Sequence, residues 1–279
     1  MRFQDYPPQP PTNPVAVPYR EACVAGSFGI PFSEFRFGED PHQSIAIYPA
    51  ARPSGPVLAF LHGGGWTNGY KETFAFMAPA LHAHGVTFAS LGYRLAPKHV
   101  FPSGFEDCAR GLRLLRGKVR AFGGDPERVF VGGHSSGGHY AALLAVRTDW
   151  QQALGLPVDF LKGCLPISGT YRFGPDSGLS VRPRFLGAED SGSDRAASPL
   201  YNIAQTPAFF VSWGDKDFPH LMRQSEEFVQ ALKGRGADVE SLLMPGCDHF
   251  GASLAAGDPD GKWVARTVAF IRRVTGAAR

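Results

Sequence analysis

The chain has 279 residues, of which 43% are hydrophobic and 19% are charged. These values are ordinary for globular proteins, so the chain can bury most of its surface without disulfide staples. The net charge of +3 is dispersed, and no long run of Lys or Arg indicates a nucleic acid or a membrane surface as partner. The length allows one large domain or two small ones.

Cysteine spacing and hydropathy indicate the cellular setting. Cys23, Cys108, Cys164 and Cys247 are far apart and form no C-x-x-C pair. Buried free thiols are therefore expected in place of zinc or redox chemistry. The N-terminus has no apolar signal stretch, and no apolar run reaches the roughly 18 residues that a membrane helix needs. We expect a cytoplasmic protein with no membrane partner.

Residues 1–20 form a Pro-rich segment with prolines at positions 7, 8, 10, 11, 14 and 18. Such sequence makes neither a helix nor a central strand. It is expected to be either a disordered tail or an extended arm laid over the body. Phe3, Tyr6 and Tyr19 are the residues that would hold an arm in place, and the two alternatives stay open.

From residue 33 onward, strand-like and helix-like segments alternate. The strand-like segments are Ser33–Phe37, Gln43–Tyr48, Val57–Leu61, Val86–Leu91, Arg128–Val131, Leu161–Pro166, Ala208–Trp213 and Val239–Met244. The helix-like segments are Lys71–His84, Phe105–Phe122, the stretch after Ser135, and residues 219–233 and 261–273. This alternation predicts a mostly parallel sheet with helices on both faces. Residues 170–204 interrupt it and are expected to form a small cap or lid at the ligand end.

The pentapeptide Gly133-His134-Ser135-Ser136-Gly137 has the pattern G-x-S-x-G between a strand-like and a helix-like segment. Small residues on both sides of the serine allow a sharp turn that exposes the hydroxyl at the end of the strand. A Gly-rich loop after a strand can also bind phosphate. However, no P-loop lysine follows, and the G-x-G-x-x-G spacing is absent. Ser135 is therefore the predicted nucleophile.

A second motif, His62-Gly63-Gly64-Gly65-Trp66, directly follows a buried strand. Consecutive glycines let backbone N–H groups converge on one point. Beside a nucleophile, such donors form an oxyanion hole that stabilises charge on a carbonyl oxygen. The predicted donors are the N–H groups of Gly64, Gly65 and Ser136, with a flexible turn as the alternative. His62 is expected to fix the loop and to have no catalytic role.

A serine nucleophile needs a base, and the base needs a residue that orients it. When a strand–turn–helix elbow carries the serine, an acid and then a histidine follow it in the sequence. His249 is the predicted base, and Asp217 is the predicted acid, with Asp215 as the alternative. Asp248 adjoins the base in sequence and is expected in solvent.

Two further histidines, His134 and His139, flank the predicted nucleophile. The tight geometry of the elbow is a sufficient reason for their positions. We expect them to pack or to form hydrogen bonds beneath the turn.

These motifs together resemble the α/β-hydrolase fold over most of residues 33–275, so the expected domain is 21–279 with the cap at about 170–204. The segment Tyr93-Arg94-Leu95-Ala96-Pro97-Lys98-His99-Val100-Phe101-Pro102, followed by Glu106-Asp107, is similar to the signature of hormone-sensitive-lipase-type esterases. The HGGGW loop is similar to that signature as well.

The chain also resembles arylformamidases, which are kynurenine formamidases. The similarity lies in Gly133–His139, in Ser198-Pro199-Leu200 and above all in Asp217–Ser225 followed by Phe228. In that family an Arg-Gln-Ser opens a helix after the acid, which favours Asp217 over Asp215. Asp248-His249-Phe250 is similar too.

Two features depart from the formamidase pattern. Gly65 stands where formamidases often carry Tyr before the Trp, and the Tyr93–Pro97 segment is esterase-like. The resemblance is therefore specific for a hydrolase but not for formamide against ester.

The predicted function is a serine hydrolase that cleaves a small aryl formamide through an acyl-enzyme, with a short-chain carboxylesterase as the alternative. No metal or organic cofactor is expected. A long-chain lipase is disfavoured because there is no large apolar lid. A non-catalytic binding module of the same fold is a minor alternative, since such proteins usually lose a triad member. The oligomeric state is left open, with a homodimer as one candidate.

Several side chains are candidates for contacting the small-molecule substrate. The aromatic candidates for an acyl or leaving-group pocket, each with core packing as its alternative, are Trp66, Tyr171, Phe173, Phe218 and Phe250. Pairing with a substrate carboxylate is considered for Arg172, Arg182 and Arg184. A solvated cap surface is the favoured interpretation for these arginines.

Overall fold

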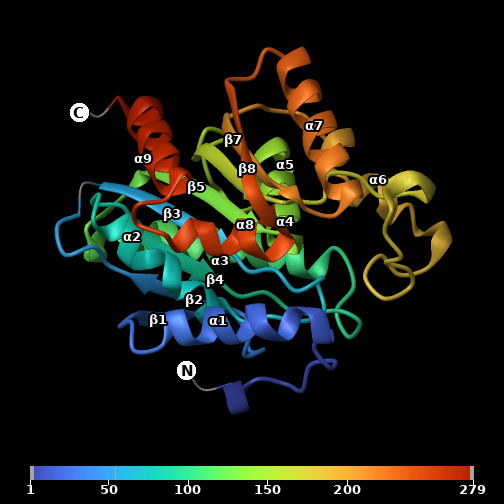
Figure 1. Cartoon of the computed structure of the whole chain (residues 1–279), viewed down its shortest axis with the longest axis horizontal. Coiled ribbons are helices and arrows are strands. Elements are labelled where there is room, and N and C mark those ends of the chain that lie inside the picture. The colour runs from blue at the N-terminus through green and yellow to red at the C-terminus, as the bar shows by residue number, and fades with distance from the viewer. Residues whose placement is uncertain (1–2, 54, 277–279) are drawn as a thin grey trace.

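The computed structural model describes residues 3–53 and 55–276. Residues 1–2 of the predicted arm, residue 54, and residues 277–279 of the predicted domain lie outside the described residues. Within these ranges, eight strands form one sheet in the order β1-β2-β4-β3-β5-β6-β7-β8 (Figure 1). Their bounds are β1 (Ser33–Arg36), β2 (Ser44–Tyr48), β3 (Gly55–Leu61), β4 (Thr87–Leu91), β5 (Gly124–His134), β6 (Leu161–Ile167), β7 (Ala208–Lys216) and β8 (Val239–Asp248).

The sheet is mostly parallel, as the alternation of segments predicted. The antiparallel pairs lie at one edge, where β1 pairs with β2 and β2 pairs with β4, and the remaining neighbours are parallel. Nearly all of β3 is buried, because helices cover both faces of the sheet. The predicted fold class is confirmed.

The strand register brings the predicted motifs to one edge of the sheet. Leu61 at the end of β3 pairs with Gly133 near the end of β5. Lys216 at the end of β7 pairs with Asp248 at the end of β8. Because these strands are parallel, the segments that follow them leave the sheet on the same side, where open α/β sheets bind ligands.

Helices form a layer on each face of the sheet (Figure 1). The helices with residues in the first core cluster are α3 (Ser103–Lys118), α4 (Ser136–Val146), α5 (Asp149–Ala153), α6 (Ser193–Ala197) and α7 (Pro219–Gly234). Those in the second are α2 (Ala78–His82), α8 (His249–Leu254) and α9 (Lys262–Thr275). The α3 helix shows why this packing forms, since its apolar residues recur at steps of three and four and become buried.

The N-terminal segment differs from its prediction. The helix α1 (Val17–Ser27) includes residues 17–20, where the sequence had predicted no helix, and it runs across the proposed domain boundary. Pro18 lies in the first turn of this helix, where the missing N–H breaks no intrahelical bond. Short 3-10 turns, η1 (Phe3–Asp5) and η2 (Pro14–Ala16), precede it. Their contacts with the body favour the arm over the tail.

The predicted helix Lys71–His84 is divided. Residues Lys71–Met77 form the 3-10 helix η3, and only Ala78–His82 is α-helical. Pro79 lies in the first turn of α2 and has no N–H to bond backwards, so an α-helix cannot run through it undisturbed. The C-terminal end of the predicted Phe105–Phe122 helix also tightens into a 3-10 turn, η4 (Val119–Phe122).

The segment 170–204 follows β6 and lies to one side of the sheet, around α6 (Ser193–Ala197) (Figure 1). It otherwise contains the 3-10 turns η5 (Pro175–Ser177), η6 (Glu189–Ser191) and η7 (Pro199–Tyr201). The last such turn of the chain is η8 (Ala255–Gly257). Among the described residues, no helix combines the length and the apolarity needed to cross a bilayer.

The cysteines are free thiols, as expected from their spacing. Cys23, Cys108 and Cys164 are buried, whereas Cys247 is only half-buried.

Candidate active site

The turn between β5 and α4 consists of Ser135 alone. Its φ of 55° and ψ of −118° are rare for a residue with a Cβ atom. The two glycines of the motif make this turn possible. A Cβ atom on Gly133 would lie 2.3 Å from the carbonyl of Gly137, and one on Gly137 would lie 2.0 Å from the Leu61 oxygen. The local sequence therefore explains the elbow, which leaves Ser135 half-buried.

The imidazole of His249 lies between Ser135 and Asp217. Its Nε2 is 3.0 Å from Ser135 Oγ, and its Nδ1 is 2.9 Å from Asp217 Oδ1. A carboxylate only accepts hydrogen bonds, so Nδ1 carries the hydrogen and Nε2 is left to accept from the serine hydroxyl. The three residues lie just after the ends of β5, β7 and β8. These strands are parallel, with β6 between β5 and β7, so their ends meet at the same edge of the sheet.

Asp217 is ionised at this position although only 4% of its surface is exposed. Burial acts to raise the pKa of this carboxyl, but the hydrogen bond and the charge of His249 act in the opposite direction and outweigh it. The net effect lowers the pKa of Asp217. The N–H of Phe218 adds a hydrogen bond of 2.7 Å to the same oxygen.

The other two aspartates considered from the sequence have different partners. Asp215 is exposed, and its Oδ1 accepts a hydrogen bond from the Gly246 N–H at 2.7 Å. Asp248 is exposed and caps α8, where its Oδ1 accepts from the Gly251 N–H at 2.7 Å. The structure thus places Asp217, and not Asp215, against His249.

The loop of Gly63, Gly64 and Gly65 lies beside the elbow. A Cβ atom on Gly63 would be 3.4 Å from the Cβ of Ser135. Gly64 and Gly65 have φ values of 130° and 61°, and a Cβ atom on Gly64 would be 2.0 Å from the Asn68 oxygen. Within the described part of the chain, the N–H groups of Gly64, Gly65 and Ser136 donate no hydrogen bond to another protein group. They remain available to an oxygen atom of a ligand.

Three buried histidines pack next to this site and form hydrogen bonds to its loops. His62 stacks on Tyr93 at 4.2 Å, and its backbone oxygen accepts a 2.6 Å hydrogen bond from the Tyr93 hydroxyl. His134 donates from Nε2 to the His249 backbone oxygen at 3.0 Å. His139 is the third of these buried histidines. Burial lowers the pKa of His62 and of His134 to about 3, with the neighbouring His249 adding to the effect at His134.

His139 connects the glycine loop to the segment 170–204. Its Nε2 donates to the Ala197 oxygen at 2.7 Å, so its Nδ1 accepts the hydrogen bond of 3.0 Å from Trp66 Nε1. Burial lowers the pKa of His139 to about 4, which keeps the ring neutral and able to accept. The expectation that His134 and His139 form hydrogen bonds beneath the turn agrees with these contacts.

The aromatic candidates divide into two groups. Trp66, Tyr171 and Phe173 are buried in the core, with Tyr171 stacked on Phe228 at 4.3 Å and 0% exposed. Core packing, the alternative from the sequence, describes these three residues. Trp66 and Phe173 nevertheless lie close to the glycine loop, where Phe185 stacks on Trp66 at 4.3 Å.

The second group flanks the His249 ring and is accessible. Phe218 is 46% exposed, and its ring centroid is 4.9 Å from that of His249. Phe250 is half-buried at 5.5 Å from His249, and it stacks on Tyr19 at 4.9 Å. Phe218 and Phe250 are therefore aromatic side chains next to the imidazole that a substrate could contact.

The arginines of the cap segment are mostly engaged within the protein. Arg172 pairs with Glu227 at 3.0 Å, and Arg182 pairs with Asp194. Arg184 is exposed. The structure therefore does not bring these arginines together as a cationic pocket, in agreement with the favoured interpretation of a cap surface.

Sequence reasoning missed four residues that shape the site. Tyr93 and Gln224 belong to the esterase-like and formamidase-like motifs, but those motifs do not predict which residues they contact. Gln224 is fully buried and accepts hydrogen bonds from the N–H groups of Tyr171 and Arg172 at 2.8 and 2.9 Å. Tyr19 was expected only to hold the arm in place, and Phe185 belongs to no short-range motif, so the sequence did not indicate that either residue contacts the site.

Known proteins of similar sequence include several hydrolases. Kynurenine formamidase from Salmo salar is 28% identical over 221 residues, which cover 77% of this chain and 73% of that protein. Esterase LipC from Mycobacterium tuberculosis is 29% identical over 85% of this chain and 64% of its own length. A probable isoprenylcysteine alpha-carbonyl methylesterase from Oryza sativa is 29% identical over 76% of this chain. This chain spans only 55% of that methylesterase.

The fold is also found in solved structures and in a family model. Esterase B from Lactobacillus rhamnosis superposes with a TM-score of 0.77 at 18% identity, covering 94% of this chain and 91% of that chain. An esterase from Pyrobaculum calidifontis gives 0.75 at 20% identity, covering 95% and 93%. At such identities the likeness concerns the fold alone. The model of a family described as the alpha/beta hydrolase fold matches residues 58–252. With this match and the sheet described above, the chain belongs to the alpha/beta hydrolase family.

Proposed function

We propose that this protein is a serine hydrolase in which Ser135 is the nucleophile, His249 the base and Asp217 the acid. The observation that carries the proposal is the hydrogen-bonded chain from Ser135 Oγ through His249 to Asp217, with distances of 3.0 and 2.9 Å. Ser135 also lies beside the glycine loop, where the N–H groups of Gly64, Gly65 and Ser136 are available to a substrate oxygen, and this supports acyl transfer over other uses of a serine.

The first half of the reaction forms an acyl-enzyme. Ser135 Oγ attacks the carbonyl carbon while its proton passes to His249 Nε2. The N–H groups of Gly64, Gly65 and Ser136 stabilise the resulting oxyanion, and one such donor typically lowers the barrier by roughly 3 kcal/mol. Asp217 holds the Nδ1–H tautomer and stabilises the imidazolium. The imidazolium then gives its proton to the leaving amine or alcohol as the carbon–nitrogen or carbon–oxygen bond breaks.

The second half releases the acyl group. A water molecule takes the place of the leaving group and gives its proton to His249 as its oxygen attacks the acyl carbon. The second tetrahedral intermediate collapses, Ser135 Oγ leaves, and His249 returns the proton to it. The products are a carboxylic acid, which is formic acid for a formamide, and the free amine or alcohol.

The proposed substrate is a small aryl formamide. The cluster of Trp66, Phe173 and Phe185 fills space beside the glycine loop, which supports a short acyl group. Phe218 and Phe250 flank His249 and would contact a flat aromatic leaving group. The similarity to kynurenine formamidases over 77% of the chain supports the same substrate class.

A short-chain carboxylic ester is the second candidate, and one observation favours it. Arg172 and Arg182 are paired with Glu227 and Asp194, so they do not present a ready partner for a carboxylate on the leaving group. An uncharged aryl ester does not need such a partner. The esterases among the relatives support this candidate as well.

A direct comparison of rates tests the substrate. Purified protein is assayed with N-formylaniline, N-formylkynurenine and p-nitrophenyl acetate under the same conditions. Turnover of either formamide with kcat/KM at or above that of the ester supports the formamidase assignment. Ester turnover without formamide turnover leaves the carboxylesterase.

The nucleophile is tested by Ser135→Ala, with Ser136→Ala as the matched control at the adjacent position. Triad members act as a unit, so Ser135→Ala should lower kcat by about 10⁴-fold or more and abolish labelling by an organophosphate. Ser136 contributes its backbone N–H, so its side-chain variant should keep most activity. Burst release of p-nitrophenol by the unaltered protein would exclude a non-catalytic binding module. Labelling that persists in Ser135→Ala would overturn the assignment.

A further inference from the structure

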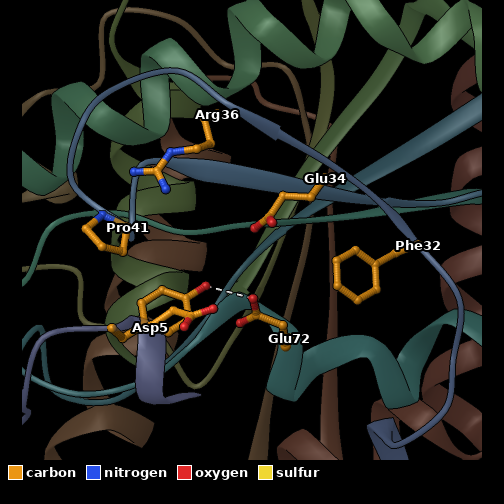
Figure 2. A pocket seen from close by; sticks show the side chains of 7 residues that line it. Asp5, Phe32, Glu34, Arg36, Pro41 and Glu72 are labelled. Atoms are coloured by element: carbon orange, nitrogen blue, oxygen red, sulfur yellow. Dashed lines mark hydrogen bonds between the residues drawn. The ribbon is translucent and has the colours of Figure 1, made fainter. Parts of the chain in front are cut away.

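The arm, which in the structure consists of residues 3–27 because it continues to the end of α1, contacts the rest of the protein next to the glycine loop. Its first attachment is Tyr6, whose hydroxyl donates to Glu72 Oε1 at 2.7 Å and accepts from Lys71 Nζ at 2.6 Å. Lys71 is 1% exposed and also pairs with Glu34 at 2.7 Å. Tyr6, Glu72, Glu34 and Phe32 line a pocket of about 350 Å³. Figure 2 shows Glu72, Glu34 and Phe32 around this pocket, with a dashed line for the hydrogen bond that Glu72 accepts.

The second attachment is Gln9, which binds the backbone just after the glycine loop. Its Oε1 accepts from the Gly69 N–H at 2.9 Å, and its Nε2 donates to the Gly69 oxygen at 3.0 Å. The same Nε2 lies 3.3 Å from His42 Nε2. Next to this pair, Asn68 donates from its side chain to the Pro10 oxygen at 2.6 Å. One glutamine therefore occupies both hydrogen-bonding groups of Gly69.

Gly69 is in close contact with the beginning of the glycine loop. A Cβ atom at this position would lie 2.3 Å from the Gly63 oxygen and 2.4 Å from His62 Nδ1. Gly64 is likewise packed against Asn68, because a Cβ atom there would lie 2.0 Å from the Asn68 oxygen. Residues 68–69 therefore pack directly against the backbone that carries the proposed oxyanion donors.

The third attachment is Tyr19, which is connected to the proposed base, His249, through His134. The Tyr19 hydroxyl is 2.8 Å from Ser253 Oγ and 3.4 Å from His134 Nδ1. Because His134 Nε2 donates to the His249 oxygen, its Nδ1 is the acceptor for Tyr19. The Tyr19 ring also stacks on Phe250, the residue after His249, at 4.9 Å.

We propose that the arm is a positioning element of the active site, acting through Gln9 on the oxyanion loop and through Tyr19 on the backbone of His249. This inference rests on the proposed function. Neither residue touches the reacting atoms, so both act through others. Oxyanion donors work because they are aligned before the reaction begins. A misplacement on the order of 1 Å can lower the rate by about 100-fold.

The first test is Gln9→Ala, with Gln4→Ala as the matched control, because Gln4 is an exposed glutamine of the same arm. We expect Gln9→Ala to lower kcat by about 10- to 100-fold with KM little changed, and Gln4→Ala to match the unaltered protein. Affinity for a small arylboronic acid, which forms a tetrahedral adduct on serine, should fall by a similar factor. Affinity for aniline, which does not need the oxyanion donors, should stay the same.

The second test is Tyr19→Phe, which keeps the ring on Phe250 but removes the hydroxyl. Tyr201→Phe is its control, since Tyr201 is exposed in the cap segment. We expect Tyr19→Phe to lower kcat by about tenfold and to change the pH profile of kcat/KM, which reports on the base. The melting temperature of each variant is measured in parallel.

Three outcomes separate the possibilities. If Gln9→Ala and Tyr19→Phe keep full activity while Ser135→Ala is inactive, the arm is only a structural attachment, and the inference is overturned. A lowered melting temperature with a raised KM and an unchanged kcat overturns it as well. If Ser135→Ala remains active, the proposed function fails, independently of any result from the arm.

Discussion

At the residue scale, the environment of each side chain decides what four histidines of one site can do. Burial keeps His62, His134 and His139 neutral, and each donates a hydrogen bond from one ring nitrogen to a backbone oxygen. His249 differs because an ionised carboxylate lies on one side of its ring and a hydroxyl on the other. The same residue type is structural or reactive according to its partners.

The assignment of Asp217 leads to a prediction about two neighbouring aspartates. Asp217→Asn should lower kcat by about 10⁴-fold, because an amide no longer fixes the His249 tautomer. Asp215→Asn should have a much smaller effect, since Asp215 is bonded to the Gly246 N–H. Steady-state kinetics on both variants, with circular dichroism to check folding, decides the matter. A reversed order of the two effects would make Asp215 the acid.

At the element scale, the helix α7 holds the beginning of the cap segment through Gln224. Its Oε1 accepts from two N–H groups, and its Nε2 donates to the Ser177 oxygen at 2.9 Å. These bonds join residues more than 45 positions apart, so the Arg-Gln-Ser that follows the acid fastens the cap segment to the body.

Removal of that side chain should be costly. Gln224→Ala leaves the buried N–H of Tyr171 and the partly buried N–H of Arg172 without a partner, and it should lower the free energy of unfolding by about 3 kcal/mol. Gln230→Ala, at an exposed position of the same helix, should change it by less than about 0.5 kcal/mol. Urea denaturation of both variants measures the difference. Equal values for the two would show that Gln224 does not hold the segment.

The aromatic cluster between the glycine loop and the cap segment leads to a prediction about acyl length. Since Trp66, Phe173 and Phe185 fill the space beside the glycine loop, kcat/KM should fall steeply beyond about four acyl carbons. Phe173→Leu enlarges that space and should raise the octanoate-to-acetate ratio of kcat/KM by about tenfold. Phe228→Leu, a buried change on the far side of Tyr171, is the control. A preference of the unaltered protein for eight carbons or more would contradict the small acyl site.

At the scale of the whole molecule, the buried histidines make stability depend on pH. The pKa is lowered to about 3 for His62 and His134 and to about 4 for His139. In the unfolded chain a histidine titrates near ~6.5. Between these values the unfolded state binds protons that the folded state does not. The free energy of unfolding therefore decreases as the pH falls from about 6.5 toward about 4.

This effect can be measured as the slope of the free energy of unfolding against pH. Each buried histidine should contribute about 1.4 kcal/mol per pH unit well below pH 6.5. His139→Gln should reduce the slope between pH 6 and pH 5 by about that amount, whereas Gln230→Ala should leave it unchanged. Urea denaturation at several pH values gives the slope directly. An unaltered slope in His139→Gln would mean that His139 is protonated in the folded protein.

Much of the fold could be predicted because it depends on local patterns. The central strands and the longer helices were found from apolar runs and periodicity, as in α3 and α7. The helix α1 was missed because the six prolines within residues 1–20 argued against any helix there. Pro18 is nevertheless compatible with a helix, since it lies in the first turn. The division of Lys71–His84 was missed because Pro79 changes hydrogen bonding without changing the apolar pattern.

The sequence by itself determined the elbow at Ser135 and the glycine loop, because in both the backbone conformation depends on adjacent small residues. It also determined which strands would carry Asp217 and His249. Only the tertiary structure decided that Asp217 and not Asp215 meets His249, that Trp66, Tyr171 and Phe173 are core residues, and that the arm binds beside the site. These outcomes depend on contacts between residues 32 to 234 positions apart, and no local pattern encodes which side chains will face one another across the end of the sheet.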